Sequence, residues 1–246
     1  MKKALEYSFY TIIFIFLWDL LSFIAKNPAI PSFLLIIKSL ISELSSTNSY
    51  KHILSTLKIL FYGIFASFVI SQLFSFVVEN FKFTKRIVCY FFDLFRTIPS
   101  ITLFPLIIAI LGIGDEARIF IIIIISTPAM FLSTTNEFDS IDKDVLMASS
   151  LDCGLLRQFV NIKYPLSLSG IFNGLKIGTG NGFVAVVVAE MLGASKGLGY
   201  MVLWSTNAFQ YPKAYAYILM IVLLGFVFNF TINFVIKKIN KKVGVL

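Results

Sequence analysis

The sequence contains several apolar stretches, each long enough to cross a lipid bilayer, and this feature limits the fold more than any other. A bilayer-spanning helix needs about 20 mostly apolar residues. Every backbone polar group inside lipid must be paired within the protein, which leaves only helices or closed barrels. Barrel strands are about 10 residues long and alternate in polarity. The stretches here are longer and apolar on all faces, so we expect helices.

The composition excludes a water-soluble fold. Of the 246 residues, 58% are hydrophobic and 14% are charged, and the mean hydropathy is +0.88. Soluble domains average roughly 45–50% apolar and about 25% charged residues. We therefore predict an all-α, polytopic membrane protein in which residues 1–246 form a single transmembrane domain. The six expected spans cover residues 7–24, 53–78, 87–111, 119–132, 171–192 and 214–236.

Two of these spans carry an ambiguity. The first could instead be a cleaved signal peptide. Asp19 inside it and the lack of a small-residue cleavage site after it favour a retained helix. The third span is interrupted by Pro99 and Pro105, which remove backbone donors from a helix.

The distribution of Lys and Arg predicts the orientation, because cytoplasmic loops carry an excess of both. With a cytoplasmic N-terminus, twelve of these residues fall inside and six fall outside. An even number of spans then puts both termini in the cytoplasm. We attribute the net charge of +8 to the excess of basic residues in cytoplasmic loops and to contact with anionic lipid. Nucleic-acid binding is disfavoured, because the basic residues lie in short loops between apolar spans.

Residues 136–170 form the more polar of two long segments outside the spans, and we expect them in the cytoplasm. Asp142 is placed to cap a short helix that begins at Lys143. Leu151, Leu155 and Phe159 recur every four residues and give one apolar stripe. Such a helix would lie on the membrane or bind a partner; a structured loop is the alternative.

The sequence offers no catalytic or cofactor chemistry. It lacks the GxxxxGK[ST] loop that cradles phosphates. His52 is the single histidine, and Cys89 and Cys153 lie far apart, so no metal-ligand spacing is present. We expect neither a metal nor a cofactor. If the protein drives active transport, the energy must come from an ion gradient or from another subunit.

Charged residues within spans usually face a helix bundle, an aqueous path or an interface. Asp19 is the most isolated. Asp93 and Arg96 are three residues apart and can pair on one helix face. Glu190 lies near the outer end of the fifth span, where a role in the path or gate competes with a structural, hydrogen-bonded role.

The fifth span also carries a stripe of glycines. Small residues at four-residue intervals let helices approach closely. The pattern predicts close helix packing, with pore lining as the alternative. The stripe consists of Gly170, Gly174, Gly178 and Gly182.

Several blocks of the sequence resemble a known family. They are residues 174–178, 187–200, 93–100, 104–106, 112–115 and 27–32. Together, and in their order along the chain, they resemble the permease subunits of ABC (ATP-binding-cassette) importers, the inner-membrane components of binding-protein-dependent transport. The branch that imports nitrate, sulfonates, taurine, bicarbonate and thiamine precursors is the most similar. The resemblance implies a type I importer permease fold.

The resemblance also implies a role for the cytoplasmic segment. Members of the family carry a motif of the form EAA-x3-G-x9-I-x-L-P, which forms a coupling helix that docks on the ATPase. Here the motif is degenerate: Asp152 stands at the glycine position and Tyr164 replaces the leucine. The residues assigned to coupling are Asp142, Asp144, Ala148, Leu151, Asp152, Gly154, Leu155, Ile162 and Pro165.

By the same resemblance, the mechanism is alternating access in a bacterial cytoplasmic membrane. The implied partners are an ABC ATPase, which would hydrolyse the ATP, an extracytoplasmic substrate-binding protein and a second copy of the permease. The path or gate would include Arg96, Pro99 and Glu190. A stand-alone secondary transporter or channel built around Asp19 remains the alternative, as does a membrane scaffold without transport.

Overall fold

The structure, a computed structural model, describes residues 2–141 and 154–243, which form helices joined by short connections. A π-helical turn, η1, joins two short helices near the middle of the chain. The elements are α1 (Lys2–Ala25), α2 (Phe33–Leu44), α3 (Thr47–Asn80), α4 (Lys82–Thr97), α5 (Ser100–Leu111), α6 (Asp115–Ser140), α8 (Leu155–Gln158), η1 (Phe159–Lys163), α9 (Tyr164–Leu166), α10 (Leu168–Gly193), α11 (Leu198–Asn207) and α12 (Tyr211–Val243).

Four of the described helices, α3, α6, α10 and α12, are each long and apolar enough to cross a membrane. The bent pair α4 and α5 raises the number to five if it counts as one span. The six spans expected from the sequence are therefore one more than length and composition support. In α1, the apolar segment found among the described residues is Ile12–Ala25, which is shorter than a full span.

The expected third span is broken into two helices. Its halves, Phe83–Thr97 and Thr102–Leu111, meet at 106°. Ile98 has an extended backbone, with ψ at 124°, because the ring of Pro99 disfavours a helical conformation in the residue before it. Pro105, by contrast, lies inside α5 without ending it. Only one of the two prolines therefore redirects the chain.

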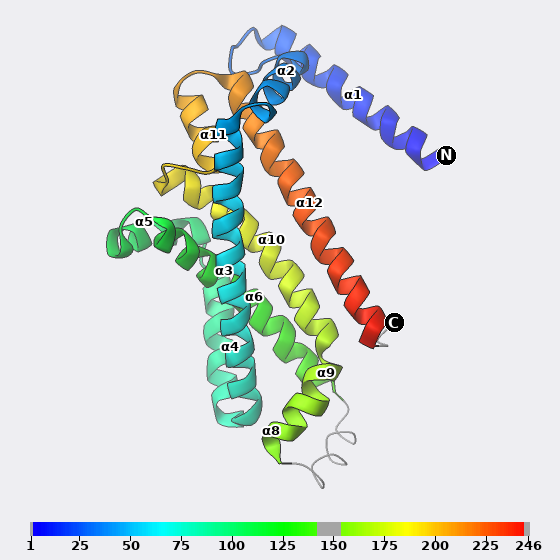
Figure 1. Ribbon diagram of the computed structural model, residues 1–246, viewed down its shortest axis with the longest axis vertical. Helices are drawn as coiled ribbons and strands as arrows, with labels where there is room; N and C mark the ends of the chain where they lie inside the picture. Colours follow the sequence, from blue (N-terminus) through cyan, green and yellow to red (C-terminus); the bar gives the residue numbers. More distant parts are fainter. Residues whose placement is uncertain (1, 142–153, 244–246) are drawn as a thin grey trace.

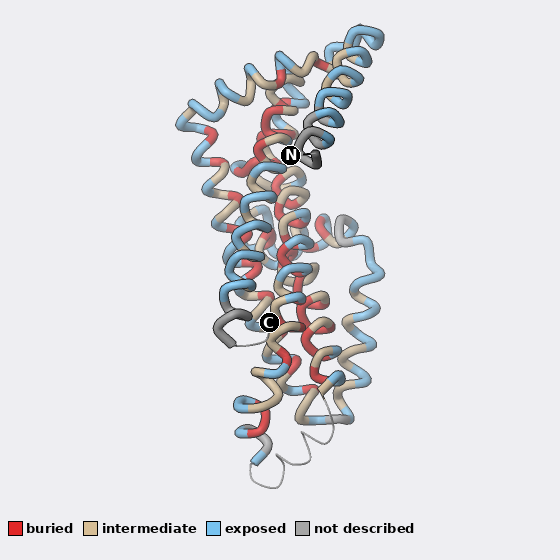
Figure 2. Tube along the Cα trace, turned by 90° about the vertical axis from the view of Figure 1, so that its right-hand side faces the viewer, coloured by how far each residue is buried: buried red, intermediate tan, exposed pale blue. Residues whose placement is uncertain are grey.

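The centre of the molecule is built from α3, α6 and α10. The most extensive packing joins α10 to α6, followed by α3 to α6. Figure 2 shows the buried residues gathered along these central helices. Around them, α12 packs on α11 and α2, while α1 leans away from the bundle (Figure 1). The largest apolar cluster includes Ile59, Leu60, Phe104, Ile122, Met130 and Val186.

Two short helices, α2 and α11, lie where the sequence indicated only loops. The connection before α2 is held against α1 by side chains of α1. Asp19 accepts a hydrogen bond from the N–H of Phe33 at 2.7 Å, and Trp18 donates to the carbonyl of Pro31 at 3.0 Å. A carboxylate at a helix N-terminus satisfies one of its free N–H groups. The isolated charge of the first span thus caps α2.

Candidate functional site

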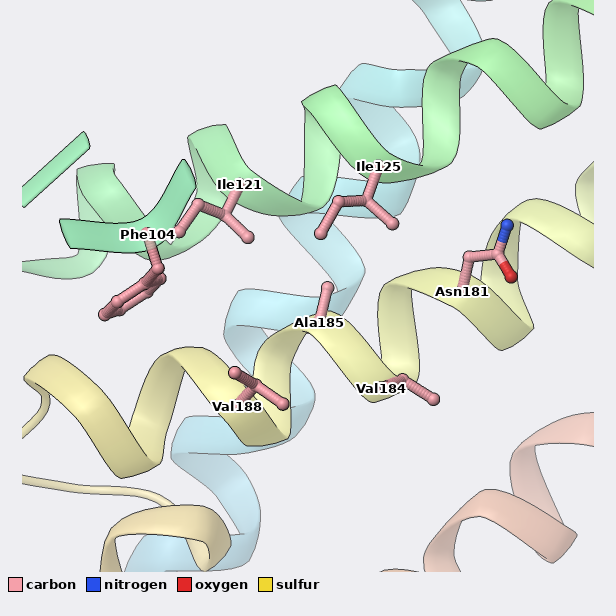
Figure 3. A pocket seen from close by; sticks show the side chains of 7 residues that line it. All are labelled: Phe104, Ile121, Ile125, Asn181, Val184, Ala185 and Val188. Atoms are coloured by element: carbon pink, nitrogen blue, oxygen red, sulfur yellow. The ribbon is translucent and has the colours of Figure 1, made fainter. Parts of the chain in front are cut away.

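Two cavities adjoin each other beside α6 and α10. The first has a volume of about 310 Å³ and is almost entirely apolar. Figure 3 shows Ile121 and Ile125 of α6 facing α10 across it, with Asn181 at one end. Because α6 and α10 form the most extensive helix contact, the cavity lies against the best-packed part of the fold.

The second cavity has a volume of about 290 Å³ and shares Ile125, Asn181 and Val184 with the first. It adds Arg96, at the end of α4, to the lining. Arg96 forms no ion pair with Asp93, although the structure describes both residues, so the expected helix-face pair is absent. A guanidinium and an amide therefore border an otherwise apolar space.

The sequence reasoning identified Arg96 but missed Asn181. Asn181 is exposed on α10 between a glycine-rich turn and a valine-rich turn, and it is the polar side chain common to both cavities. An amide in the middle of an apolar span is the signal that marks it. Pro99 lies beside this region at the α4–α5 bend and does not line either cavity.

Glu190 lies elsewhere, fully buried at the end of α10. Its carboxylate accepts hydrogen bonds from the hydroxyl of Thr56 at 2.8 Å and from the N–H of Gly199 at 2.9 Å. It lines neither of these two cavities. The structure thus separates Glu190 from Arg96, with which the sequence grouped it.

Glu190 belongs to a set of three side chains that bind the start of α11. The N–H groups of residues 197, 198 and 199 donate to His52 Nδ1, Thr56 Oγ1 and Glu190 Oε2, respectively. These are donors that a helix N-terminus leaves without a partner in its own helix. The three side chains therefore join α3, α10 and α11 at one point.

Glycine is required at the first of these positions. Gly197 has φ of +125°, which other residues rarely adopt, and a Cβ there would collide with the carboxylate of Glu190. The sequence block from Glu190 to Tyr200 is thus explained by one turn that brings backbone donors onto a buried carboxylate. This is a local structural reason for that motif.

The glycine stripe of α10 faces α6 and the neighbouring part of α3. Gly170 lies against Glu137, and Gly174 lies against the carbonyl of Met130. Gly178 contacts the Met130 side chain, and Gly182 contacts Ile64, Ser126 and Ile122. Each glycine therefore lies where an added Cβ would press on a neighbouring helix.

The expected coupling residues are only partly within the described chain. Asp142, Asp144, Ala148, Leu151 and Asp152 lie outside the described residues. Gly154 directly precedes α8, Leu155 begins it, Ile162 lies in η1 and Pro165 lies in α9. These elements form one end of the molecule, opposite α11 (Figure 1).

The segment α8–η1–α9 is joined firmly to the bundle. Phe159 packs edge-on against Phe76 of α3 and Phe138 of α6, with ring centroids 4.8 Å and 5.4 Å away. Lys163 forms an ion pair with Glu79 at the end of α3, at 2.7 Å. Lys85 of α4 also pairs with Glu79 and with Asp139 of α6. Movement of this segment would thus reach α3 and α6 directly, and α4 through Glu79.

Comparison with protein families identifies the chain. Residues 69–245 match the family described as "Binding-protein-dependent transport system inner membrane component". The chain belongs to this family. The match covers α4 to α12, and with them both cavities and the α8–η1–α9 segment. The chain is thus a multi-pass membrane protein of an inner-membrane permease family.

Individual relatives are distant. The chain is 28% identical over 166 residues to the nitrate import permease protein NrtB of Synechocystis, covering 67% of this chain and 59% of that protein. It is 26% identical over 147 residues to the putative aliphatic sulfonates transport permease protein SsuC of Bacillus subtilis, covering 58% and 53%. The chain thus spans little more than half the length of these curated relatives.

The fold is also found in a solved transporter. A chain of the methionine ABC transporter MetNI, solved in inward-facing conformations, superposes with a TM-score of 0.65. The alignment covers 79% of this chain and 95% of that chain at 20% sequence identity. The helical architecture is therefore that of an ABC importer permease, as the sequence blocks predicted.

Proposed function

We propose that this chain, as one transmembrane unit, is the permease subunit of an ABC importer and forms the path for a small polar or anionic solute. The observation that carries the proposal is the pair of adjoining cavities beside α6 and α10, within the matched family region. The cavities are apolar except at Arg96 and Asn181, which leaves two groups to orient a polar solute.

An anionic solute fits these two groups best. A guanidinium offers several fixed N–H donors and binds oxyanions through paired hydrogen bonds. The names of the relatives, which specify nitrate and aliphatic sulfonates, support the same chemical class. Glu190, which is buried and bonded to α3 and α11, is assigned to holding α3, α10 and α11 together rather than to contact with solute.

Energy for transport would come from a separate ATPase subunit. The α8–η1–α9 segment, together with residues 142–153, is the proposed contact for that subunit. Its buried Phe159 and its Lys163–Glu79 ion pair would pass motion to α3, α4 and α6. An extracytoplasmic binding protein and a second copy of the chain complete the proposed assembly.

The α8 end would face the cytoplasm. In that orientation α12, which runs from the α11 end toward the α8 end, would end on the cytoplasmic side (Figure 1). The excess of Lys and Arg in the inside loops supports the same orientation.

The test is co-purification of the detergent-solubilised chain with the ATPase of its transport system. Val160 is 55% exposed on the α8–η1–α9 segment, so Val160→Glu adds a charge there without disturbing the core. Phe209→Glu makes the same kind of change at the opposite end, where Phe209 is 78% exposed. We expect Val160→Glu to release the ATPase and Phe209→Glu to retain it.

Retention of the ATPase by both variants would refute the coupling assignment. Failure of the native chain to bind any ATPase would refute the importer itself. Size-exclusion profiles of both variants matching the native profile would establish that neither change unfolds the chain.

A further inference from the structure

A third cavity lies at the α11 end of the molecule, away from the proposed path. It has a volume of about 370 Å³ and is formed by the start of α3, the α10–α11 connection, α11 and the start of α12. Its lining includes Lys51, His52, Lys196, Tyr200, Trp204 and Lys213. We propose that this cavity binds an oxyanion group, such as a sulfate, sulfonate or phosphate.

The charged side chains that line the cavity are all lysines. Lys213 is paired with Glu43 at 2.8 Å and also lies over the ring of Trp204, at 5.7 Å from its centroid. Lys51 and Lys196 form no ion pair with any described acidic residue. Two lysines without an acidic partner thus remain beside a cavity of molecular size, and an anion would supply the missing counter-charge.

His52 adds an oriented donor. The imidazole is 7% exposed and stacks on Tyr200, with ring centroids 6.0 Å apart. Its Nδ1 accepts the hydrogen bond of the Gly197 N–H, so the proton of the ring is on Nε2. No described residue is hydrogen-bonded to Nε2. The fold thus fixes a buried ring in the tautomer that offers an N–H to a ligand.

The aromatic walls define the rest of the ligand. Tyr200 and Trp204 give flat apolar surfaces beside the cationic groups. The cavity therefore suits an oxyanion that carries a small organic part. Two sources of such a group exist at a membrane surface, a dissolved anion and the headgroup of an anionic lipid. The proposal concerns binding by this chain alone and is independent of ATPase coupling.

Trp204 provides the measurement, because the chain has only two tryptophans. The full-length chain is placed in nanodiscs of zwitterionic lipid and titrated with sodium sulfate and sodium ethanesulfonate. Sodium chloride at equal ionic strength is the salt control. We expect a saturable change in tryptophan fluorescence that Trp204→Phe removes.

The charge requirement is tested with matched variants. Lys51→Gln combined with Lys196→Gln is expected to weaken binding about tenfold or more, since hydrogen bonds to charged groups are worth about 1.5–3 kcal/mol. Lys38→Gln combined with Lys58→Gln removes the same charge from exposed positions outside the cavity and is expected to leave binding unchanged.

A response that chloride reproduces, or that both double variants share with the native chain, would overturn the proposal. Nanodiscs that contain phosphatidylglycerol distinguish the source. Weaker sulfate binding in them identifies a lipid phosphate as an occupant, whereas unchanged binding identifies a dissolved anion; both results support an oxyanion site.

Discussion

At the residue scale, the charges within the apolar helices fall into different classes once their partners are known. Asp19 caps α2, and Glu190 binds the start of α11, so both are engaged by backbone donors. Arg96 lines a cavity and has no acidic partner among the described residues. Of these three charges, Arg96 is therefore the one available to a solute.

Replacing Arg96 should impair transport without unfolding the chain. Because it is exposed and unpaired, Arg96→Gln removes few internal contacts. We expect uptake of an anionic solute to fall about tenfold or more, from the loss of a charge-assisted hydrogen bond. Arg86→Gln, an equally exposed change on the same helix, is the control. Equal uptake by the native chain and Arg96→Gln would remove Arg96 from the path.

The hydroxyl of Thr56 should be essential to the three-helix junction. It donates to Glu190 and accepts from the N–H of Leu198 at 2.9 Å, all in a fully buried setting. Thr56→Val keeps the shape but removes one hydrogen bond from Glu190 and leaves the Leu198 N–H without its acceptor, and an unsatisfied buried group costs about 1–3 kcal/mol. We expect a clear loss of stability in denaturant unfolding, largely restored in Thr56→Ser. If Thr56→Val left the stability unchanged, the junction would contribute little to the stability of the fold.

Glu43 should make stability depend on pH. Burial raises the pKa of its carboxyl, but the hydrogen bonds from Lys213, Tyr217 and Ser49 outweigh burial and hold the pKa below its ordinary value of 4.5. The folded protein therefore favours the ionised form. Stability from Glu43 is present above pH 4.5 and is lost as the pH falls through the lowered pKa.

The comparison is between the native chain and Glu43→Gln, with melting temperature measured from neutral to acidic pH. We expect the difference between them to be largest at neutral pH and to shrink below pH 4.5. A difference that grows on acidification would contradict the assigned direction of the pKa.

At the scale of elements, the long helices could be predicted from the sequence and the short ones could not. The expected spans 53–78, 119–132, 171–192 and 214–236 lie within α3, α6, α10 and α12, since long apolar runs leave the chain no other form in lipid. α2 and α11 are shorter than a span. Contacts that sequence periodicity cannot reveal hold them in place, such as the hydrogen bonds from the N–H of Phe33 to Asp19 and from the N–H of Gly199 to Glu190.

The candidate site was predicted only in part for a similar reason. Arg96 stood out as a charge in an apolar span, but Asn181 becomes meaningful only when α5, α6 and α10 enclose a cavity around it. The bend between α4 and α5 was indicated by Pro99 as an interruption. Its size of 106° depends on tertiary packing and was not predictable.

The effect of replacing a glycine of α10 by alanine should depend on what that glycine faces. A Cβ on Gly174 would lie 2.9 Å from the carbonyl of Met130, which cannot move without its helix. Gly174→Ala should therefore destabilise the chain by about 1–3 kcal/mol. Gly180 faces open space, so Gly180→Ala should be neutral or stabilising by about 0.5–1 kcal/mol. Equal effects in unfolding experiments would contradict the close approach of the two helices.

At the scale of the whole molecule, the two ends have different chemistry. One end carries the α8–η1–α9 segment, which an ion pair and aromatic contacts tie to α3 and α6. The other carries a cationic cavity and the three-helix junction. The apolar cavities lie between them, along the best-packed helix pair. This arrangement suits a chain that converts movement at one end into opening at the other.

The central claim is that solute movement through this chain is driven by an attached ATPase. The most direct measurement is uptake of labelled nitrate or aliphatic sulfonate into proteoliposomes that contain the chain with its ATPase and binding protein. We predict uptake that requires ATP and the binding protein and that a protonophore does not reduce. Uptake by the chain alone, driven by an imposed proton gradient, would contradict the account and establish a stand-alone transporter.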